Sequence, residues 1–308
     1  MKFETVEKTV AVIGAGAVGL LYGSRLQKAG LKVQYQSRTM AGIRKLEVDS
    51  IWGKEDMEVE IFDSPTKMSP ADIILITVKA LPEIDYNSLI RPVWKASSVL
   101  VLLQNGIGND EKIHSLFPSN PLIGGLAFVC VFRDQQAIHH LDYGRLVLAP
   151  YGKEKSIAKE LADIFESVSV PVEVSENLRK ARWQKLFWNI PFNPLSVILQ
   201  ASTEEMMNSK HAVQLCRDLM QETKQIANAE GHSISDDFIE DMLDKTRKMK
   251  PYKTSMLLDF ENHRPMEVEA ILGEPLRIAN RQNIHAPKME TIYHQLSFLE
   301  ERNSKMKG

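Results

Sequence analysis

A polar stripe inside an apolar segment is the feature of this chain that most suggests chemistry. Residues 183–199 are apolar almost all the way round a helix, which is typical of a buried helix. Lys185, Asn189 and Asn193 interrupt the segment at intervals of four residues and therefore share one helix face. Buried amines and amides are costly unless they have partners, so the pattern favours a stripe that lines a polar site. A lysine that extends to the surface beside two structural amides is the alternative.

Burial gives the lysine of this stripe a chemical use. Removal from water lowers the pKa of an ammonium group toward neutrality. A lysine with such a pKa is well suited to donate a proton. We therefore expect Lys185 to act as a proton donor.

Two further polar residues follow short apolar runs in the N-terminal half. Lys79 follows Ile73–Val78, and Asn105 lies just beyond Val99–Leu103. Ligands of open α/β sheets bind outside the carboxyl ends of the strands, so both side chains are expected at a binding site. Lysine is also common on surfaces and Asn-Gly is a common turn pair, so ordinary turn residues are the alternative.

A candidate carboxylate lies in the C-terminal part. Glu267 comes two residues after Pro265, which suits the first turn of a helix. From this pattern alone, Glu267 either stabilises the helix dipole or takes part in a site. Asp259 is open to the same two interpretations.

The N-terminal segment predicts the element that binds a cofactor. A short apolar run, Val10–Ile13, leads into a glycine-rich turn, an amphipathic stretch and a second apolar run, Leu31–Tyr35. This order is typical of a dinucleotide-binding unit, in which the helix start binds phosphates. A plain strand-to-helix turn is the alternative. The turn consists of Gly14, Ala15, Gly16, Ala17, Val18 and Gly19.

Each glycine of the turn has a separate expected role. Gly14 permits the tight turn, Gly16 lets the backbone approach a pyrophosphate, and Gly19 lets the helix pack against the strand.

The end of the second apolar run indicates which dinucleotide binds. NAD-binding units carry an acidic residue about 20 residues past the glycines. Here Gln36, Ser37 and Arg38 follow the run, and the first acidic residue beyond them is Glu47. A serine and an arginine at this place suit the 2′-phosphate of NADP, because arginine binds phosphate through a planar fork of donors. A solvated surface arginine is the alternative.

Composition excludes several other classes. The chain has 308 residues, enough for two domains, and a net charge of −2, with no basic stripe that would indicate nucleic acid. Two cysteines are too few for a disulfide framework or a zinc site, so no metal is expected and a reducing cytoplasm fits. The first ten residues lack the apolar core of a signal peptide, and no apolar run is long enough to span a membrane.

Periodicity divides the chain near residue 175. Residues 1–175 alternate apolar runs with helical patterns, which predicts a parallel α/β sheet. Within it we expect a hairpin between residues 50–52 and 58–62. Residues 176–308 are predicted to be helical. The later strands are expected at Gly124–Phe132, Ile138–Leu148 and Val170–Val174, with a helix at Ser156–Glu166; the C-terminal helices are expected at Asn177–Leu199, His211–Glu230, Asp236–Thr246, Arg264–Arg281 and Ala286–Glu301.

This ordered set of motifs resembles the ketopantoate reductase (2-dehydropantoate 2-reductase) family over nearly the whole chain. The resemblance implies a Rossmann domain followed by a helical domain like that of 6-phosphogluconate dehydrogenase, with the active site in the cleft between them. The matching segments are the glycine turn, Val78-Lys79-Ala80, Gln104-Asn105-Gly106, Lys185 with Asn189, Asn193-Pro194-Leu195, Ser255-Met256-Leu257, Asp259 and Glu267.

The resemblance also implies a role for each matching residue. Lys185 is implied to be the general acid that protonates the ketone oxygen, and Glu267 to orient the substrate and that lysine. Ser255 is implied to lie near the substrate carboxylate. The residues expected at the cofactor are Gly14, Ala15, Gly16, Ala17, Val18, Gly19, Ser37, Arg38, Lys79 and Asn105; those expected at the substrate are Asn105, Lys185, Asn189, Asn193, Ser255 and Glu267.

The implied reaction is the NADPH-dependent reduction of 2-dehydropantoate to pantoate, a step of pantothenate and coenzyme A biosynthesis. A reductase of another 2-oxo or 3-oxo acid is one alternative, and an NADPH-binding sensor without turnover is another. Lys185 and Glu267 argue against the sensor, because sensing needs no proton donor. The expected partner is a small 2-oxo acid, in the cytoplasm, with no nucleic acid and no membrane; the oligomeric state is open, a homodimer among the expected forms.

Overall fold

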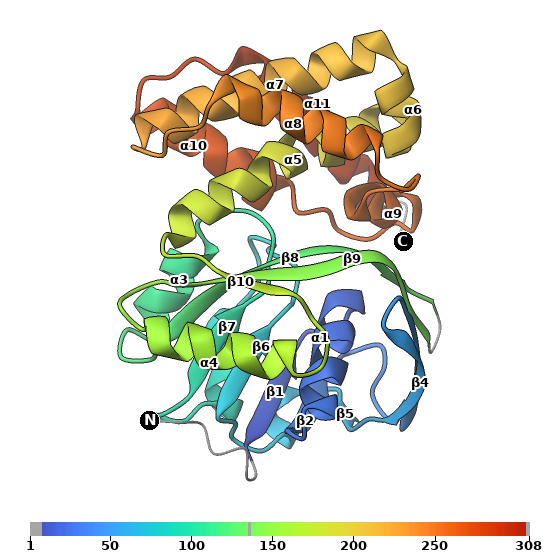
Figure 1. Cartoon of the computed structure of the whole chain (residues 1–308), viewed down its shortest axis with the longest axis vertical. Coiled ribbons are helices and arrows are strands. Elements are labelled where there is room, and N and C mark those ends of the chain that lie inside the picture. Colours follow the sequence, from blue (N-terminus) through green and yellow to red (C-terminus); the bar gives the residue numbers. More distant parts are fainter. Residues whose placement is uncertain (1–7, 135–136, 306–308) are drawn as a thin grey trace. The chain divides into compact units, whose positions relative to one another are not determined.

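The computed structural model describes residues 8–134 and 137–305, which fall into two compact units (Figure 1). Unit 1 contains the described residues up to Lys79, together with Glu83–Gln104 and Asn109–Ala181. Unit 2 contains Ala80–Pro82, Asn105–Gly108 and the described residues from Arg182 onward. Two short loops of the N-terminal half therefore belong to the C-terminal unit. The sequence-based boundary between residues 175 and 176 stays a prediction.

Unit 1 is built on a mixed sheet of ten strands in the order β4-β3-β9-β8-β7-β6-β1-β2-β5, with β10 paired to β9. All pairings are parallel except β3 with β4 and β8 with β9. The strands are β1 (Thr9–Ile13), β2 (Lys32–Gln36), β3 (Lys45–Ser50), β4 (Gly53–Glu58), β5 (Ile61–Phe62), β6 (Ile73–Ile76), β7 (Val99–Leu102), β8 (Leu122–Arg133), β9 (Ala137–Pro150) and β10 (Val172–Val174).

Helices cover both faces of this sheet, which explains the continuous apolar runs of its central strands. In β1, Val10 and Val12 pack in one core cluster with residues of α1 and α4, whereas Ala11 and Ile13 pack in another with residues of α2 and α3. Every residue of β6 and β7 is buried. The helices are α1 (Ala17–Lys28), α2 (Tyr86–Ile90), α3 (Asn109–Leu116) and α4 (Lys155–Glu166).

The predicted strands and the expected sheet class are confirmed, but the predicted hairpin is wrong. The hairpin joins β3 to β4, with Ser50 opposite Gly53, and the positive φ of Gly53 (+117°) permits the tight connection. Ile61 and Phe62 pair with β2 in parallel instead. The reason is burial: Ile61 joins the core beside β2 and is only 5% exposed.

Unit 2 is helical, and no strand occurs among its described residues. Its core is built around α5, whose Trp183, Phe187 and Phe192 are fully buried. Its helices are α5 (Leu178–Leu199, whose first turn lies in unit 1), α6 (Thr203–Asn208), α7 (Lys210–Ala229), α8 (Asp236–Arg247), α9 (Ser255–Glu261), a π-helix (Glu269–Gly273), α10 (Glu274–Arg281) and α11 (Pro287–Lys305).

The predicted helices of unit 2 are confirmed with one correction. The helix expected from Arg264 begins only after Glu267 and opens with the π-helix. Side-chain partners hold the preceding residues outside a helix: Arg264 Nε donates to Asp259, and the N–H of Met266 donates to Glu300. Pro265 therefore precedes the helix and does not form its first turn. The short helices α6 and α9 were not predicted.

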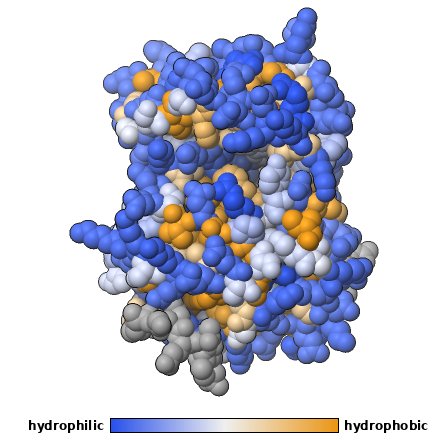
Figure 2. Space-filling model, in the orientation of Figure 1, coloured by the Kyte–Doolittle hydropathy of each residue, from blue (hydrophilic) through white to orange (hydrophobic). Residues whose placement is uncertain are grey.

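No helix of the described chain is long and apolar enough to cross a membrane. On the face drawn in Figure 2, hydrophilic residues predominate and hydrophobic residues form separate groups.

Candidate active site

The glycine turn of unit 1 has the geometry of a phosphate-binding turn. Gly14 has a φ of +98°, and a Cβ there would lie 2.5 Å from the backbone nitrogen of Val78. A Cβ on Gly19 would contact Thr77 Oγ1, which donates to the Gly14 carbonyl at 2.7 Å. Gly16 faces open space, since no described atom lies within 4 Å of a Cβ built there. The turn is thus closed on its protein side and accessible at Gly16.

Helix α1 presents its N-terminus at this turn. It begins at Ala17, directly after Gly16, and its first turn holds no acidic residue. The free N–H groups and the positive end of the helix dipole therefore attract an anion without a competing carboxylate.

Ser37, Arg38 and Lys79 follow the carboxyl ends of strands that flank β1. Strand β2 ends at Gln36 and β6 ends at Ile76, and both pair with β1 in parallel. Ser37 is buried and its N–H donates to the Phe62 carbonyl at 2.8 Å, whereas Arg38 is exposed and Lys79 is half-buried. The strand ends thus place a serine and two cations at the edge of the sheet that carries the glycine turn.

The polar stripe of unit 2 lies on α5, which continues through Pro191 and Pro194. Asn189 is 4% exposed and Asn193 is 2% exposed. Among the described residues, Nδ2 of Asn189 and Oδ1 of Asn193 have no hydrogen-bond partner. Buried polar atoms left without a partner are rare and costly, so this pair is suited to hold a ligand.

Lys185 begins the stripe and has an altered acidity. Loss of water around its ammonium group is the main reason that its pKa falls from 10.5 to about 7. Arg182, one helical turn earlier, lowers the pKa further by charge repulsion, and the carboxylate of Glu267 opposes both effects. The side chain is partly exposed, which leaves it accessible to a small molecule.

Glu267 is held by tertiary contacts. Its Oε1 accepts the backbone N–H of Ala80 at 2.8 Å, and its Oε2 accepts Nδ2 of Asn105 at 3.1 Å. All three residues belong to unit 2. The carboxylate is therefore engaged by two distant loops, while its charge raises the pKa of Lys185.

Ser255 lies close to the far end of the stripe. It is the exposed first residue of α9, directly after Thr254, whose hydroxyl caps that helix. Oγ1 of Thr254 lies 2.7 Å from Oγ of Ser196, which in turn donates to the Asn193 carbonyl at 2.8 Å.

Unit 2 thus gathers the substrate candidates, and unit 1 holds the cofactor candidates other than Asn105. The sequence did not single out Ala80 as a backbone donor, nor Arg182 and the Ser196–Thr254 pair. A backbone donor has no residue signature, and hydroxyl residues are common. The position of Arg182, one turn before Lys185, was the one available signal.

Unit 1 holds a glycine turn that is open to a phosphate group. Unit 2 holds a group of lysine, carboxylate and amide side chains. These two features are typical of the class of dinucleotide-dependent oxidoreductases. The family model described as "Ketopantoate reductase PanE/ApbA" matches residues 10–153, and the model of its C-terminal part matches residues 177–300. The chain belongs to the ketopantoate reductase family.

Similar proteins extend over almost the full chain. A curated 2-dehydropantoate 2-reductase of Nostoc sp. (strain PCC 7120) is 38% identical over 96% of this chain and 97% of its own length. The crystal structure of a 2-dehydropantoate 2-reductase from Geobacter metallireducens GS-15 matches with a TM-score of 0.89 at 35% identity, covering 96% of this chain and all of that one (100%). The enzyme of the same name from Methylococcus capsulatus matches with a TM-score of 0.86 at 35% identity, with coverages of 96% and 98%.

Proposed function

We propose that this chain catalyses the NADPH-dependent reduction of 2-dehydropantoate to pantoate, a step of pantothenate and coenzyme A biosynthesis. The observation that carries the proposal is the contact of Glu267 with Asn105, beside a Lys185 with a pKa of about 7. Membership of the family and the 38% identical 2-dehydropantoate 2-reductase support the same reaction.

Lys185 acts as the general acid. The keto oxygen of a 2-oxo acid gains negative charge during reduction, and a cation placed on it stabilises the transition state more than the ground state. An ammonium group with a pKa of about 7 is also able to give up its proton to that oxygen. Glu267 keeps the ammonium in place and raises its pKa toward the protonated form.

The amides of α5 bind the rest of the substrate. Asn189 offers an unused N–H and Asn193 an unused oxygen, both buried. A hydroxyl group satisfies such a pair, because it accepts one hydrogen bond and donates another. The substrate 2-dehydropantoate carries a hydroxyl besides its keto and carboxylate groups, and Ser255 is the residue proposed for the carboxylate.

The cofactor residues fit NADPH, which supplies the hydride when it is bound. Gly14, Gly16 and Gly19 with the start of α1 bind the pyrophosphate. Ser37 and Arg38 bind the 2′-phosphate, and Lys79 contacts the cofactor from the end of β6. Asn105 serves both cofactor and substrate.

The roles of the two parts of the chain extend this proposal. Residues 1–175 bind NADP and residues 176–308 bind the substrate and form a homodimer. The enzyme acts in the cytoplasm on a small 2-oxo acid.

The test is the oxidation of NADPH, followed by its absorbance, with and without 2-dehydropantoate. We expect turnover with this substrate and a much lower kcat/KM for 3,3-dimethyl-2-oxobutanoate, which lacks only the hydroxyl. Equal turnover of the two acids would indicate a reductase of another oxo acid. Binding of NADPH without oxidation by any oxo acid would indicate the sensor.

A further inference from the structure

A π-helix, Glu269–Gly273, begins two residues after Glu267. π-Helical turns are rare and often occur at functional sites. Inside this one, the carbonyl of Ala270 accepts the backbone N–H of Ile107 at 3.2 Å. Gly106 has a φ of +86°, and a Cβ there would contact the Ala270 carbonyl oxygen. The π-helix and the loop that carries Asn105 are therefore in direct backbone contact.

The first residue of the π-helix is held by two side chains. Oε1 of Glu269 accepts the hydroxyl of Tyr293 at 2.6 Å, and Oε2 accepts Nη1 of Arg277 at 2.8 Å. Arg277 is oriented in turn by Glu274, at 2.8 Å. A Cβ on Gly273 would contact Oε2 of Glu269, so a larger residue there would require this carboxylate to move. Three helical segments thus converge on Glu269.

We propose that Glu269, with Tyr293 and Arg277, is a positioning group that fixes the π-helix and thereby aims the Glu267 carboxylate at Asn105 and the Ala80 N–H. This inference deepens the proposed reductase function and rests on it. In this proposal the effect of Glu269 on the reaction is transmitted through Glu267.

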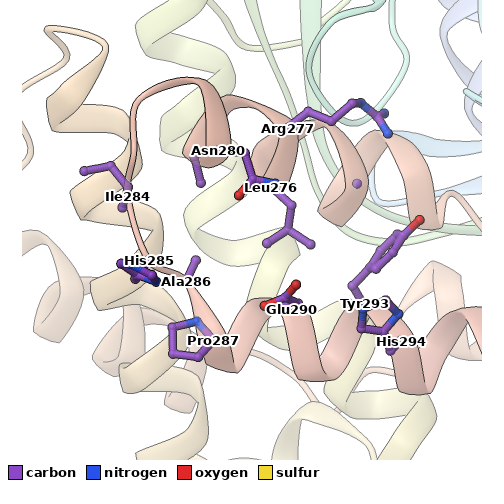
Figure 3. Close-up of a pocket in the computed structure, with 12 residues that line it drawn as sticks. Leu276, Arg277, Asn280, Ile284, His285, Ala286, Pro287, Glu290, Tyr293 and His294 are labelled. Atoms are coloured by element: carbon purple, nitrogen blue, oxygen red, sulfur yellow. The ribbon is translucent and has the colours of Figure 1, made fainter.

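The surroundings of Tyr293 allow the role of this positioning group to be tested. Tyr293 and Arg277 line a cavity of about 250 Å³ between α10 and α11, and their side chains lie toward the same end of it (Figure 3). Glu290, His285 and His294 also line the cavity. Because Tyr293 borders open volume, loss of its hydroxyl removes the hydrogen bonds to Glu269 and Ser297 without forcing the core to repack.

The experiment is a double-mutant cycle of Tyr293→Phe with Glu267→Gln in the full chain. In the wild-type background, Tyr293→Phe should lower kcat/KM for 2-dehydropantoate roughly 3- to 30-fold, which lies within the range of coupling between interacting residues. In the Glu267→Gln background it should have less than a twofold effect. An undiminished effect in that background, or no effect in the wild type, would overturn the proposal.

The matched control is Thr291→Val. It removes another hydroxyl from α11, one that donates only to the Pro287 carbonyl at 2.8 Å. We expect unchanged kcat/KM for this variant. Equal losses of kcat/KM in Thr291→Val and Tyr293→Phe would show a general effect on α11 and overturn the proposal.

A second readout does not need the substrate. The rate of Lys185 acetylation by trace acetic anhydride, measured by mass spectrometry across pH, follows the fraction of free amine. Since Glu267 raises the pKa of Lys185, a displaced Glu267 should move the midpoint of this curve to lower pH in Tyr293→Phe. An unmoved midpoint would refute the positioning role of Glu269 even if the wild type reduces 2-dehydropantoate. A shifted midpoint in a protein that reduces no oxo acid would refute the reductase alone.

Discussion

Lys185 is subject to opposing influences that together set its acidity. Loss of water and the charge of Arg182 favour the neutral amine, whereas Glu267 favours the ammonium. A lysine far from charges and water would be neutral at physiological pH, and a solvated lysine would hold its proton too tightly. The balance near pH 7 is what suits this residue to proton transfer.

Replacement of Lys185 by alanine should lower kcat by about 10²–10⁴-fold, the usual contribution of general acid catalysis. The dissociation constant of NADPH, measured by fluorescence titration, should change little. Gln184→Ala, at the exposed neighbouring position, is the control and should retain activity. A near-normal kcat in folded Lys185→Ala would remove this residue from the mechanism.

The pH profile of the wild type should report the same lysine. Protonated Lys185 is the active form, so kcat/KM should fall as the pH rises through about 7. Steady-state kinetics across pH in constant ionic strength test this. A profile flat into the alkaline range would contradict the lowered pKa.

Replacement of Glu267 by glutamine should separate the two interpretations of this residue. The amide retains the shape but loses the charge that raises the pKa of Lys185, and it keeps only one of the two oxygens that accept from Ala80 and Asn105. We expect kcat/KM to fall about 10-fold or more, with the alkaline decline moved to lower pH and only the small loss of Tm that one lost hydrogen bond causes. Glu290→Gln, exposed on α11, is the control. A loss of Tm with unchanged kinetics would return Glu267 to a structural role.

Strands β2 and β6 bring residues that are distant in the sequence together at one edge of the sheet. These strands flank β1 in parallel, so the residues after them lie at the edge where the glycine turn lies. Sequence periodicity predicted these strands because both of their faces are buried. It failed for β5, whose two residues depend on pairing with β2 for their place in the core.

The Arg38→Asp variant tests the end of β2. Loss of the guanidinium should weaken NADPH binding roughly 10- to 100-fold, as for a charge-assisted hydrogen bond, and leave NADH equal or improved. The ratio of kcat/KM values for the two cofactors measures this preference. Lys32→Asp, exposed at the opposite end of the same strand, is the control. If the wild type uses both cofactors equally well, the 2′-phosphate assignment fails.

Burial of Lys185 should lower the free energy of unfolding of the whole molecule, by an amount that depends on pH. In the unfolded chain its pKa is near 10.5, and in the folded chain about 7. Between these two pKa values Lys185 is protonated in the unfolded state and neutral in the folded state, so the free energy of unfolding rises with pH. Below pH 7 Lys185 is protonated in both states, and the full destabilisation from its burial is present. Lys185→Met should therefore raise Tm more at about pH 6 than at about pH 9, by roughly 2–4 °C per kcal/mol removed. Equal gains at both pH values, in calorimetry, would contradict this.

Features that depend on near neighbours along the chain could be predicted from the sequence alone. Periods of two and 3.6 residues set most strands and helices, the glycine turn set the phosphate-binding geometry, and four-residue spacing set the stripe of Lys185, Asn189 and Asn193. These patterns reach across one or two turns, so they identify faces of elements.

The groups that those faces contact depend on how the chain folds in three dimensions. Glu267 is bound by Asn105, 162 residues away, and by Ala80, 187 residues away. The π-helix and the start of its helix after Pro265 likewise depend on Tyr293, Arg277, Asp259 and Glu300. A local pattern carries no record of such partners, because a carboxylate near a helix start has the same sequence signature whether it stabilises the dipole or orients a lysine.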